Sequence, residues 1–170
     1  MLIWYADVSD MTEEQMKKYL EELSEYRLEK VNRLRYEKDK KLSVAAGILF
    51  DRALKECHLS EKDCRYQIME HGKVYLADHP EIAFNISHSG CVAVLIFHKE
   101  TKHDLSCGID IELIQGGREK IVNRLFSEAD REQYKKLDPD AAALYFARVW
   151  TRMESVSYTH LRAHETCADL

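Results

Sequence analysis

The sequence has little that would direct the chain to a membrane, an oxidising compartment or a nucleic acid. No apolar run approaches the roughly 18 residues that a membrane-spanning helix needs, and residues 1–10 show no signal-peptide pattern. The five cysteines form no C-x-x-C pair and are odd in number, which argues against a zinc knuckle or a disulfide framework. A net charge of −5 argues against general nucleic-acid binding. We therefore expect a cytoplasmic monomer with reduced thiols and without membrane or nucleic-acid partners.

The pattern of the remaining residues predicts a mixed fold. Apolar residues make up 45 % and charged residues 32 % of the 170 positions, and neither a low-complexity linker nor an internal repeat is present. Alternating or β-rich segments predict strands at residues 2–8, 64–70, 83–86, 91–98 and 106–114. Helical spacing and capping residues predict two helices within residues 12–34, with Thr12 as N-cap, and further helices from 42, over 118–126, from 127 and over 141–155. This order of elements favours an α+β (α/β-like) fold.

Two carboxylates stand on one face of the segment at residues 108–112. Side chains alternate along a strand, so Asp110 and Glu112 should point the same way, while Ile109, Ile111 and Leu113 should point to the core. Paired carboxylates repel each other unless water or a cation relieves them, and hard oxygen ligands suit Mg²⁺. A metal site and a solvated acidic edge explain this local pattern about equally well.

Two further features add candidate ligands. Glu154 lies on an apolar helix, where its carboxylate is able to complete a three-oxygen metal site or simply be solvated. Residues 84–90 (FNISHSG) gather Asn, Ser and His in what we expect to be a tight turn, a combination able to hold a phosphate. An ordinary polar turn is the alternative for that motif taken alone.

A basic segment lies earlier in the chain. Residues 27–41 contain seven positive and three negative side chains, a local +4 in a chain of net −5. Such a reversal of charge suits a phosphate-rich ligand. A solvated helix face with i,i+4 ion pairs accounts for the same pattern, and the two interpretations stay open on these residues alone.

Together, these motifs resemble the 4′-phosphopantetheinyl transferase superfamily, and in particular its surfactin-synthetase-activating branch. The family hallmark is G-I-D followed downstream by W-[ST]-x-K-E-[SA], matched here by residues 108–112 (GIDIE) and 150–155 (WTRMES). The upstream F-N-[IV]-S-H-S motif matches residues 84–89, a G-K-P turn is matched in part at Gly72 and Lys73, and a basic segment leading into A-A-G matches residues 38–47. Four motifs in this order make the resemblance specific over nearly all of residues 1–155.

The resemblance implies a function and a set of site residues. Members of the family move phosphopantetheine from coenzyme A to a serine of an apo acyl or peptidyl carrier protein and release 3′,5′-ADP, in fatty-acid, polyketide or nonribosomal peptide biosynthesis. Carried over to this sequence, Mg²⁺ would be held by Asp110, Glu112 and Glu154, with Glu154 or Glu112 as the base that takes the serine proton. The residues expected to bind coenzyme A are Arg35, Lys38, Lys41, Gly72, Lys73, Ser87 and His88.

The resemblance also implies two similar lobes, of which the second is incomplete here: an N-terminal lobe at 1–104 and a partial C-terminal lobe at 105–155. Met153 stands where most relatives have lysine, and the sequence leaves the family pattern after Ser155. We expect residues 156–170 to be a non-native tail, similar to translated sequencing-adaptor sequence, and expect this exact chain to be poorly soluble and inactive.

Two alternatives stay open. One is a non-catalytic remnant that still binds coenzyme A or a carrier protein, and the other is a different Mg²⁺-dependent phosphoryl enzyme.

Overall fold

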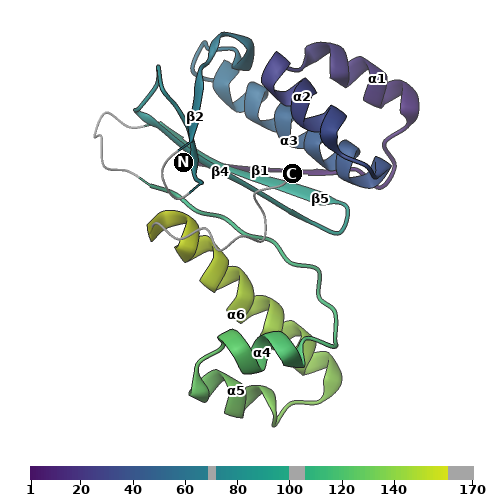
Figure 1. Ribbon diagram of the computed structural model, residues 1–170, viewed down its shortest axis with the longest axis vertical. Coiled ribbons are helices and arrows are strands. Elements are labelled where there is room, and N and C mark those ends of the chain that lie inside the picture. Colours follow the sequence, from purple (N-terminus) through teal and green to yellow (C-terminus); the bar gives the residue numbers. More distant parts are fainter. Residues whose placement is uncertain (69–71, 100–105, 161–170) are drawn as a thin grey trace.

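A three-stranded antiparallel sheet forms the centre of the chain in the computed structural model, which describes residues 1–68, 72–99 and 106–160. Its strands are β1 (Leu2–Asp7), β4 (Ile82–Ser89) and β5 (Val92–Lys99), in the order β1-β5-β4. A small second sheet pairs β2 (Tyr66–Ile68) with β3 (Val74–Leu76), also antiparallel. Figure 1 shows helices on both sides of the central sheet.

Three helices cover one face of the sheet: α1 (Glu13–Glu22), α2 (Glu25–Arg33) and α3 (Glu37–Lys55). The α1 N-terminus has the predicted capping box, because Thr12 accepts the Gln15 N–H and Gln15 reaches back to the Thr12 N–H. Phe50 of α3 packs on Phe84 of β4, with ring centroids 4.2 Å apart. A Cβ on Gly47 would lie 2.6 Å from Leu23 Cδ2, so glycine allows the α1–α2 junction to approach α3 closely.

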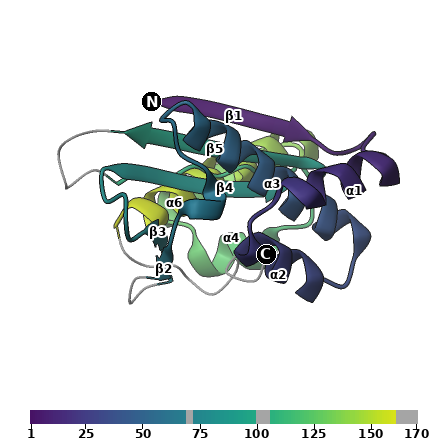
Figure 2. The same ribbon diagram turned by 90° about the horizontal axis from the view of Figure 1, so that it is seen from above.

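A separate helical cluster follows, formed by α4 (Glu119–Leu125), α5 (Glu128–Tyr134) and α6 (Pro139–His160). Ser127 caps α5 as predicted by accepting the Asp130 N–H. This cluster has its own apolar core, in which Phe146 lies between Phe126 and Trp150 at centroid distances of 5.5 and 5.7 Å. Figure 2 shows α3 lying over the sheet and α6 behind β4 and β5.

The strand predicted at residues 106–114 is absent, and this expectation was wrong. The described backbone over 106–115 forms no ladder, but runs extended along the face of β4 that is opposite α3. Its amides meet side chains of β4 instead of backbone carbonyls, so no sheet forms. Leu113 does not point to the core as expected, since 52 % of it is exposed.

Some of the other secondary-structure predictions are confirmed, and others are wrong. The mixed α+β class is confirmed, as are the strands at β1 and β5 and the helices α1 to α6, although α3 begins at Glu37 and not at residue 42. The turn expected at 84–90 is wrong, because β4 continues through Ser89 and the chain turns only at Gly90, whose φ is +61°. The short strand β3 was missed. No helix in the described ranges is long and apolar enough to cross a bilayer.

The boundaries of the two lobes stay predictions, and the structure separates the apolar cluster around Phe50 from the one around Phe146. That residues 156–170 form a non-native tail also stays a prediction. Helix α6 runs to His160, and positions 161–170 lie outside the described residues.

Candidate active site around Asp110

The two faces of β4 serve different parts of the chain. Phe84 and Ile86 face α3 and pack in the main apolar cluster, and His88 follows them on that face. The intervening Asn85, Ser87 and Ser89 therefore face the other way, toward the extended segment at 108–113. One short motif thus contributes to both sides of the sheet.

Side chains of β4 hold that segment at every second residue. Asn85 Oδ1 accepts the Ile109 N–H at 2.8 Å, and Ser89 Oγ accepts the Leu113 N–H at 2.9 Å. Between them, Ser87 Oγ accepts the Ile111 N–H at 3.3 Å. The three contacts give the segment a fixed register on β4 and direct the side chain of residue 110 toward Ser87.

Asp110 has one oxygen bonded and one unsatisfied. The Ser87 hydroxyl donates to Asp110 Oδ1 at 2.6 Å, whereas the buried Oδ2 has no hydrogen-bond partner among the residues that the structure describes. Burial raises the pKa of Asp110, with Glu112 adding to the rise and the Ser87 and Ile111 hydrogen bonds opposing it. An unsatisfied buried carboxylate oxygen is costly, and a cation or a proton would remove that cost.

Glu112 has a cationic neighbour that the sequence did not suggest. Arg118 Nη2 lies 3.2 Å from Glu112 Oε1, and the two side chains are 30 % and 17 % exposed. The Arg118 guanidinium also lies over the Phe146 ring, 5.7 Å from its centroid. This arginine therefore links the extended segment at residues 108–113, hereafter the acidic segment, to α6. Only its short sequence separation from Glu112 was available as a signal.

Glu154 lies half-buried on α6 and has interactions of its own. Within residues 1–68, 72–99 and 106–156, no three His, Cys, Asp or Glu side chains form a group able to hold a metal ion. The structure thus brings Asp110 and Glu112 near each other but does not close a three-carboxylate set with Glu154. The metal role of all three stays a prediction.

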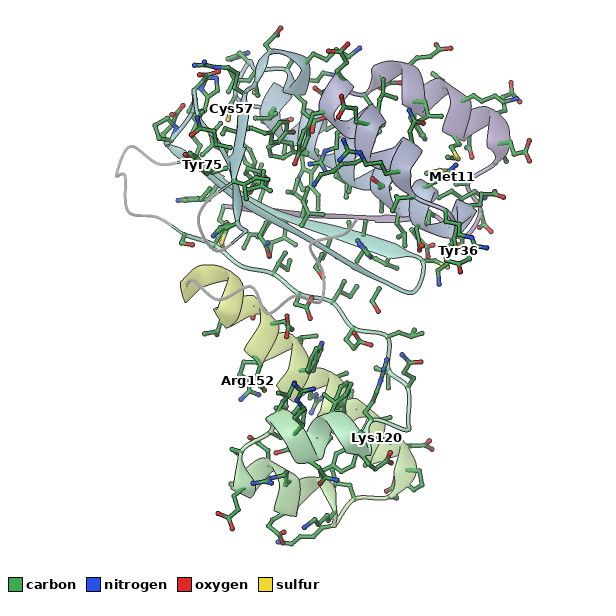
Figure 3. The ribbon with its side chains drawn as sticks, in the orientation of Figure 1. Met11, Tyr36, Cys57, Tyr75, Lys120 and Arg152 are labelled. Carbon is green, nitrogen blue, oxygen red and sulfur yellow. The ribbon has the colours of Figure 1, made fainter. Side chains whose placement is uncertain are left out.

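Burial lowers the pKa of His88, and the Asp39 carboxylate, in the first turn of α3, acts in the opposite direction. No side chain caps the N-terminus of α3 at Tyr36. Figure 3 shows Tyr36 at the end of the sheet where β4 turns into β5. Arg35 and Lys38 flank this residue and are exposed, with no carboxylate partner in the described part of the chain.

The other predicted coenzyme A residues are already engaged. Lys41 pairs with Glu37 at 3.2 Å. Lys73 Nζ donates to Ser106 Oγ at 2.6 Å and to the Cys107 carbonyl at 3.2 Å, and burial lowers its pKa. Gly72 has a φ of +82°, which favours glycine at that turn. These contacts tie the β2–β3 hairpin to the start of the acidic segment.

Part of the basic segment is not available to a ligand. Arg27 is only 7 % exposed, and its Nε lies 2.7 Å from Glu61 Oε1. Arg33 pairs with Glu29 at 3.2 Å in an exposed i,i+4 pair. The local +4 is therefore divided between a buried ion pair, solvated helix pairs and the exposed cations beside α3.

Family models match both parts of the chain. The model described as "4′-phosphopantetheinyl transferase, N-terminal" matches residues 10–100, and that of the 4′-phosphopantetheinyl transferase superfamily matches residues 106–157. The first match alone covers more than half of the chain. This chain belongs to the 4′-phosphopantetheinyl transferase superfamily. The second match includes the acidic segment and α6 through Glu154.

Several curated members of the superfamily are similar in sequence. The 4′-phosphopantetheinyl transferase Sfp of Bacillus subtilis is 27 % identical over 146 residues, which cover 85 % of this chain and 63 % of that protein. A second B. subtilis 4′-phosphopantetheinyl transferase is 29 % identical over 75 % of this chain and 55 % of its own length. AcpT of Escherichia coli K12 is 29 % identical over 51 % of this chain and 44 % of its own length. The chain thus spans less than two thirds of these relatives, and the similarity to Sfp agrees with the resemblance of the motifs to the surfactin-activating branch.

Proposed function

We propose that this protein transfers 4′-phosphopantetheine from coenzyme A to a serine hydroxyl of an apo acyl or peptidyl carrier protein. In that reaction the serine oxygen forms a bond to the phosphorus nearer the pantetheine, the bond to the 3′,5′-ADP oxygen breaks, and the serine proton passes to a base. The superfamily matches support the reaction class, and the named relatives carry the same activity in their names.

The observation that carries the proposal is the buried, unsatisfied Oδ2 of Asp110 on the segment that bears the family motif. It fits a hard divalent cation such as Mg²⁺, for which carboxylate oxygens are preferred ligands. Asp110, Glu112 and Glu154 would hold the ion, although Glu112 would then share its carboxylate with Arg118. Bound there, Mg²⁺ would neutralise charge on the pyrophosphate.

The protein's own residues supply binding and proton transfer. Arg35 and Lys38 are exposed and able to pair with phosphate oxygens, and His88 is able to donate from its ring to the 3′-phosphate. Lys41 and Lys73 would contribute only by exchanging their present partners, and Gly72 would shape the hairpin beside the nucleotide. Glu154 or Glu112 would accept the serine proton.

Carrier-protein loading tests the proposal. A version of the chain that is completed beyond Ser155 along the family pattern is incubated with coenzyme A, Mg²⁺ and an apo carrier protein, because the 170-residue chain itself is expected to be inactive, and the phosphopantetheine adduct is measured by mass spectrometry. We expect Asp110→Ala to lower the loading rate by at least about a thousandfold while leaving the circular dichroism spectrum unchanged, since metal stabilisation of developing charge is worth several kcal/mol. Equal loading by this variant would contradict the proposal. Coenzyme A binding without loading by the parent would favour the non-catalytic alternative.

A further inference from the structure

The Ser87 hydroxyl uses its only donor position inside the protein. Ser87 is only 9 % exposed, donates its proton to Asp110 Oδ1 at 2.6 Å and accepts the Ile111 N–H at 3.3 Å. A serine hydroxyl has one donor and two acceptor positions, so its only proton is already used. A phosphate requires donors, and Ser87 has none left for a coenzyme A phosphate while it holds Asp110.

We infer that Ser87 is a positioning residue that holds Asp110 Oδ1, so that Oδ2 stays available to a divalent, oxygen-preferring cation. The inference rests on the proposed function and differs from the sequence-based expectation that Ser87 contacts coenzyme A. Hydrogen bonding to one oxygen fixes the carboxylate plane and leaves the second oxygen unsatisfied in a buried place. Partners of this kind orient metal ligands, and their loss typically lowers metal affinity about 10–100-fold.

Asn85 and Ser89 make only one of the two kinds of contact that Ser87 makes. Each accepts one backbone N–H of the same segment, at 2.8 and 2.9 Å, but neither has a described contact to a carboxylate. They set the register of the segment on β4, whereas Ser87 also sets the orientation of Asp110. Ser89 is thus a matched control: the same residue type, on the same strand face, with the same kind of backbone contact.

The experiment measures Mn²⁺ binding to the 170-residue chain by the loss of the free Mn²⁺ signal in electron paramagnetic resonance. We expect Ser87→Ala to weaken Mn²⁺ binding by about 10-fold or more, and Ser87→Thr, which keeps the hydroxyl, to stay within about threefold of the parent. The Mn²⁺ affinity of Ser89→Ala should stay within about twofold of that of the parent. Ser89 holds only the backbone of the segment, and losing one such hydrogen bond does not change the orientation of Asp110. Ser87→Cys, of similar size but with a weaker donor, should fall between the parent and Ser87→Ala, and replaces that variant if it does not fold.

Coenzyme A binding in EDTA provides the second readout and should not change in Ser87→Ala. A tenfold loss of coenzyme A affinity there would assign the hydroxyl to the ligand and overturn the inference. Parent-like Mn²⁺ binding by both Ser87→Ala and Ser87→Cys, with weak binding by Asp110→Ala, would overturn the inference alone. Parent-like Mn²⁺ binding by Asp110→Ala would overturn the metal site of the proposed function as well.

Discussion

Among the residues that the structure describes, two carboxylates each leave one buried oxygen without a hydrogen bond, but their surroundings differ. Glu61 is 1 % exposed, and its Oε1 is bonded both by Arg27 Nε, at 2.7 Å, and by the Tyr66 hydroxyl. Asp110 has only the Ser87 hydroxyl and the partial charge of a backbone amide, and no lysine or arginine of the described residues pairs with it. Glu61 therefore has a cationic partner, Arg27, within the fold, whereas Asp110 has none among the described residues.

The Glu61 region is a closed structural unit. Although burial alone lowers the pKa of Arg27, the adjacent Glu61 carboxylate raises it above its ordinary value, so the arginine stays charged. Tyr26 stacks on Tyr66 with centroids 4.1 Å apart, and the Arg27 guanidinium lies 5.9 Å from both ring centroids. The cluster joins α2 to β2 and so supports the hairpin that carries Gly72 and Lys73. The contrast supports the proposal that Asp110, unlike Glu61, takes its cation from outside the chain.

Breaking the internal pair should have the largest effect on stability. Glu61→Ala leaves Arg27 buried without its anion, which typically costs about 3–5 kcal/mol. We expect urea unfolding to show a loss of that size. Glu29→Ala, which breaks the exposed pair with Arg33, should change the free energy of unfolding by no more than about 0.5 kcal/mol. Equal losses in the two variants would remove the distinction between a structural and a solvated pair.

Neutralising the other carboxylate should have a much smaller effect in the absence of metal. Asp110→Asn keeps an oxygen that accepts the Ser87 hydroxyl while removing a buried charge without a counterion. In EDTA, we therefore expect the free energy of unfolding to fall by less than about 1 kcal/mol, or to rise. A loss as large as that of Glu61→Ala would mean that Asp110 is a structural residue with a partner inside the fold.

Added metal should make the Asp110 region resemble the Glu61 region, because the bound ion would give Asp110 a cationic partner. A ligand that binds only the folded chain at ten times its dissociation constant stabilises it by about 1.4 kcal/mol. Mg²⁺ should therefore raise the thermal midpoint of the parent by a few degrees and leave that of Asp110→Asn unchanged. Calorimetric melting with and without Mg²⁺ checks this, and an equal rise in both proteins would place the ion elsewhere.

The smallest effect concerns His88, on the opposite face of β4. Its pKa in the folded chain is lowered from 6.5 by burial, so the unfolded chain takes up the proton more readily. Stability should therefore fall as pH drops through about 6.5, and His88→Gln should flatten that dependence. Coenzyme A should reduce the loss more than dephospho-coenzyme A does, because the 3′-phosphate favours the charged ring. Identical protection by the two ligands would show that His88 does not contact that phosphate.

Much of the fold could be predicted because its signals are local. Thr12 and Ser127 cap helices within their own first turns, and the alternation along β1 and β5 is continuous in sequence. The segment at 106–114 was wrongly predicted to be a strand, because the alternation of apolar and polar side chains requires only an extended backbone. Whether it becomes a strand depends on its neighbour, and here the neighbour offers side chains of Asn85, Ser87 and Ser89.

The site was less accessible to sequence reasoning because its contacts are distant along the chain. Arg27 looked like part of a basic surface, and nothing near it indicates Glu61 as its partner. The motif at 84–89 drew attention to Ser87 and His88, whose site roles stay predictions, but it did not show that the two would lie on opposite faces of β4. The sequence did not identify Arg118 as part of the site, and only its contact with Glu112 in the structure places it there.

A crystal of the chain soaked with Mn²⁺ and coenzyme A tests the central claim most directly, through the anomalous scattering of manganese. The account predicts an anomalous peak within about 2.5 Å of Asp110 Oδ2, with the Ser87 hydroxyl still bonded to Oδ1. A well-ordered Asp110 with no peak beside it, or a manganese peak bound only by other residues, would contradict it.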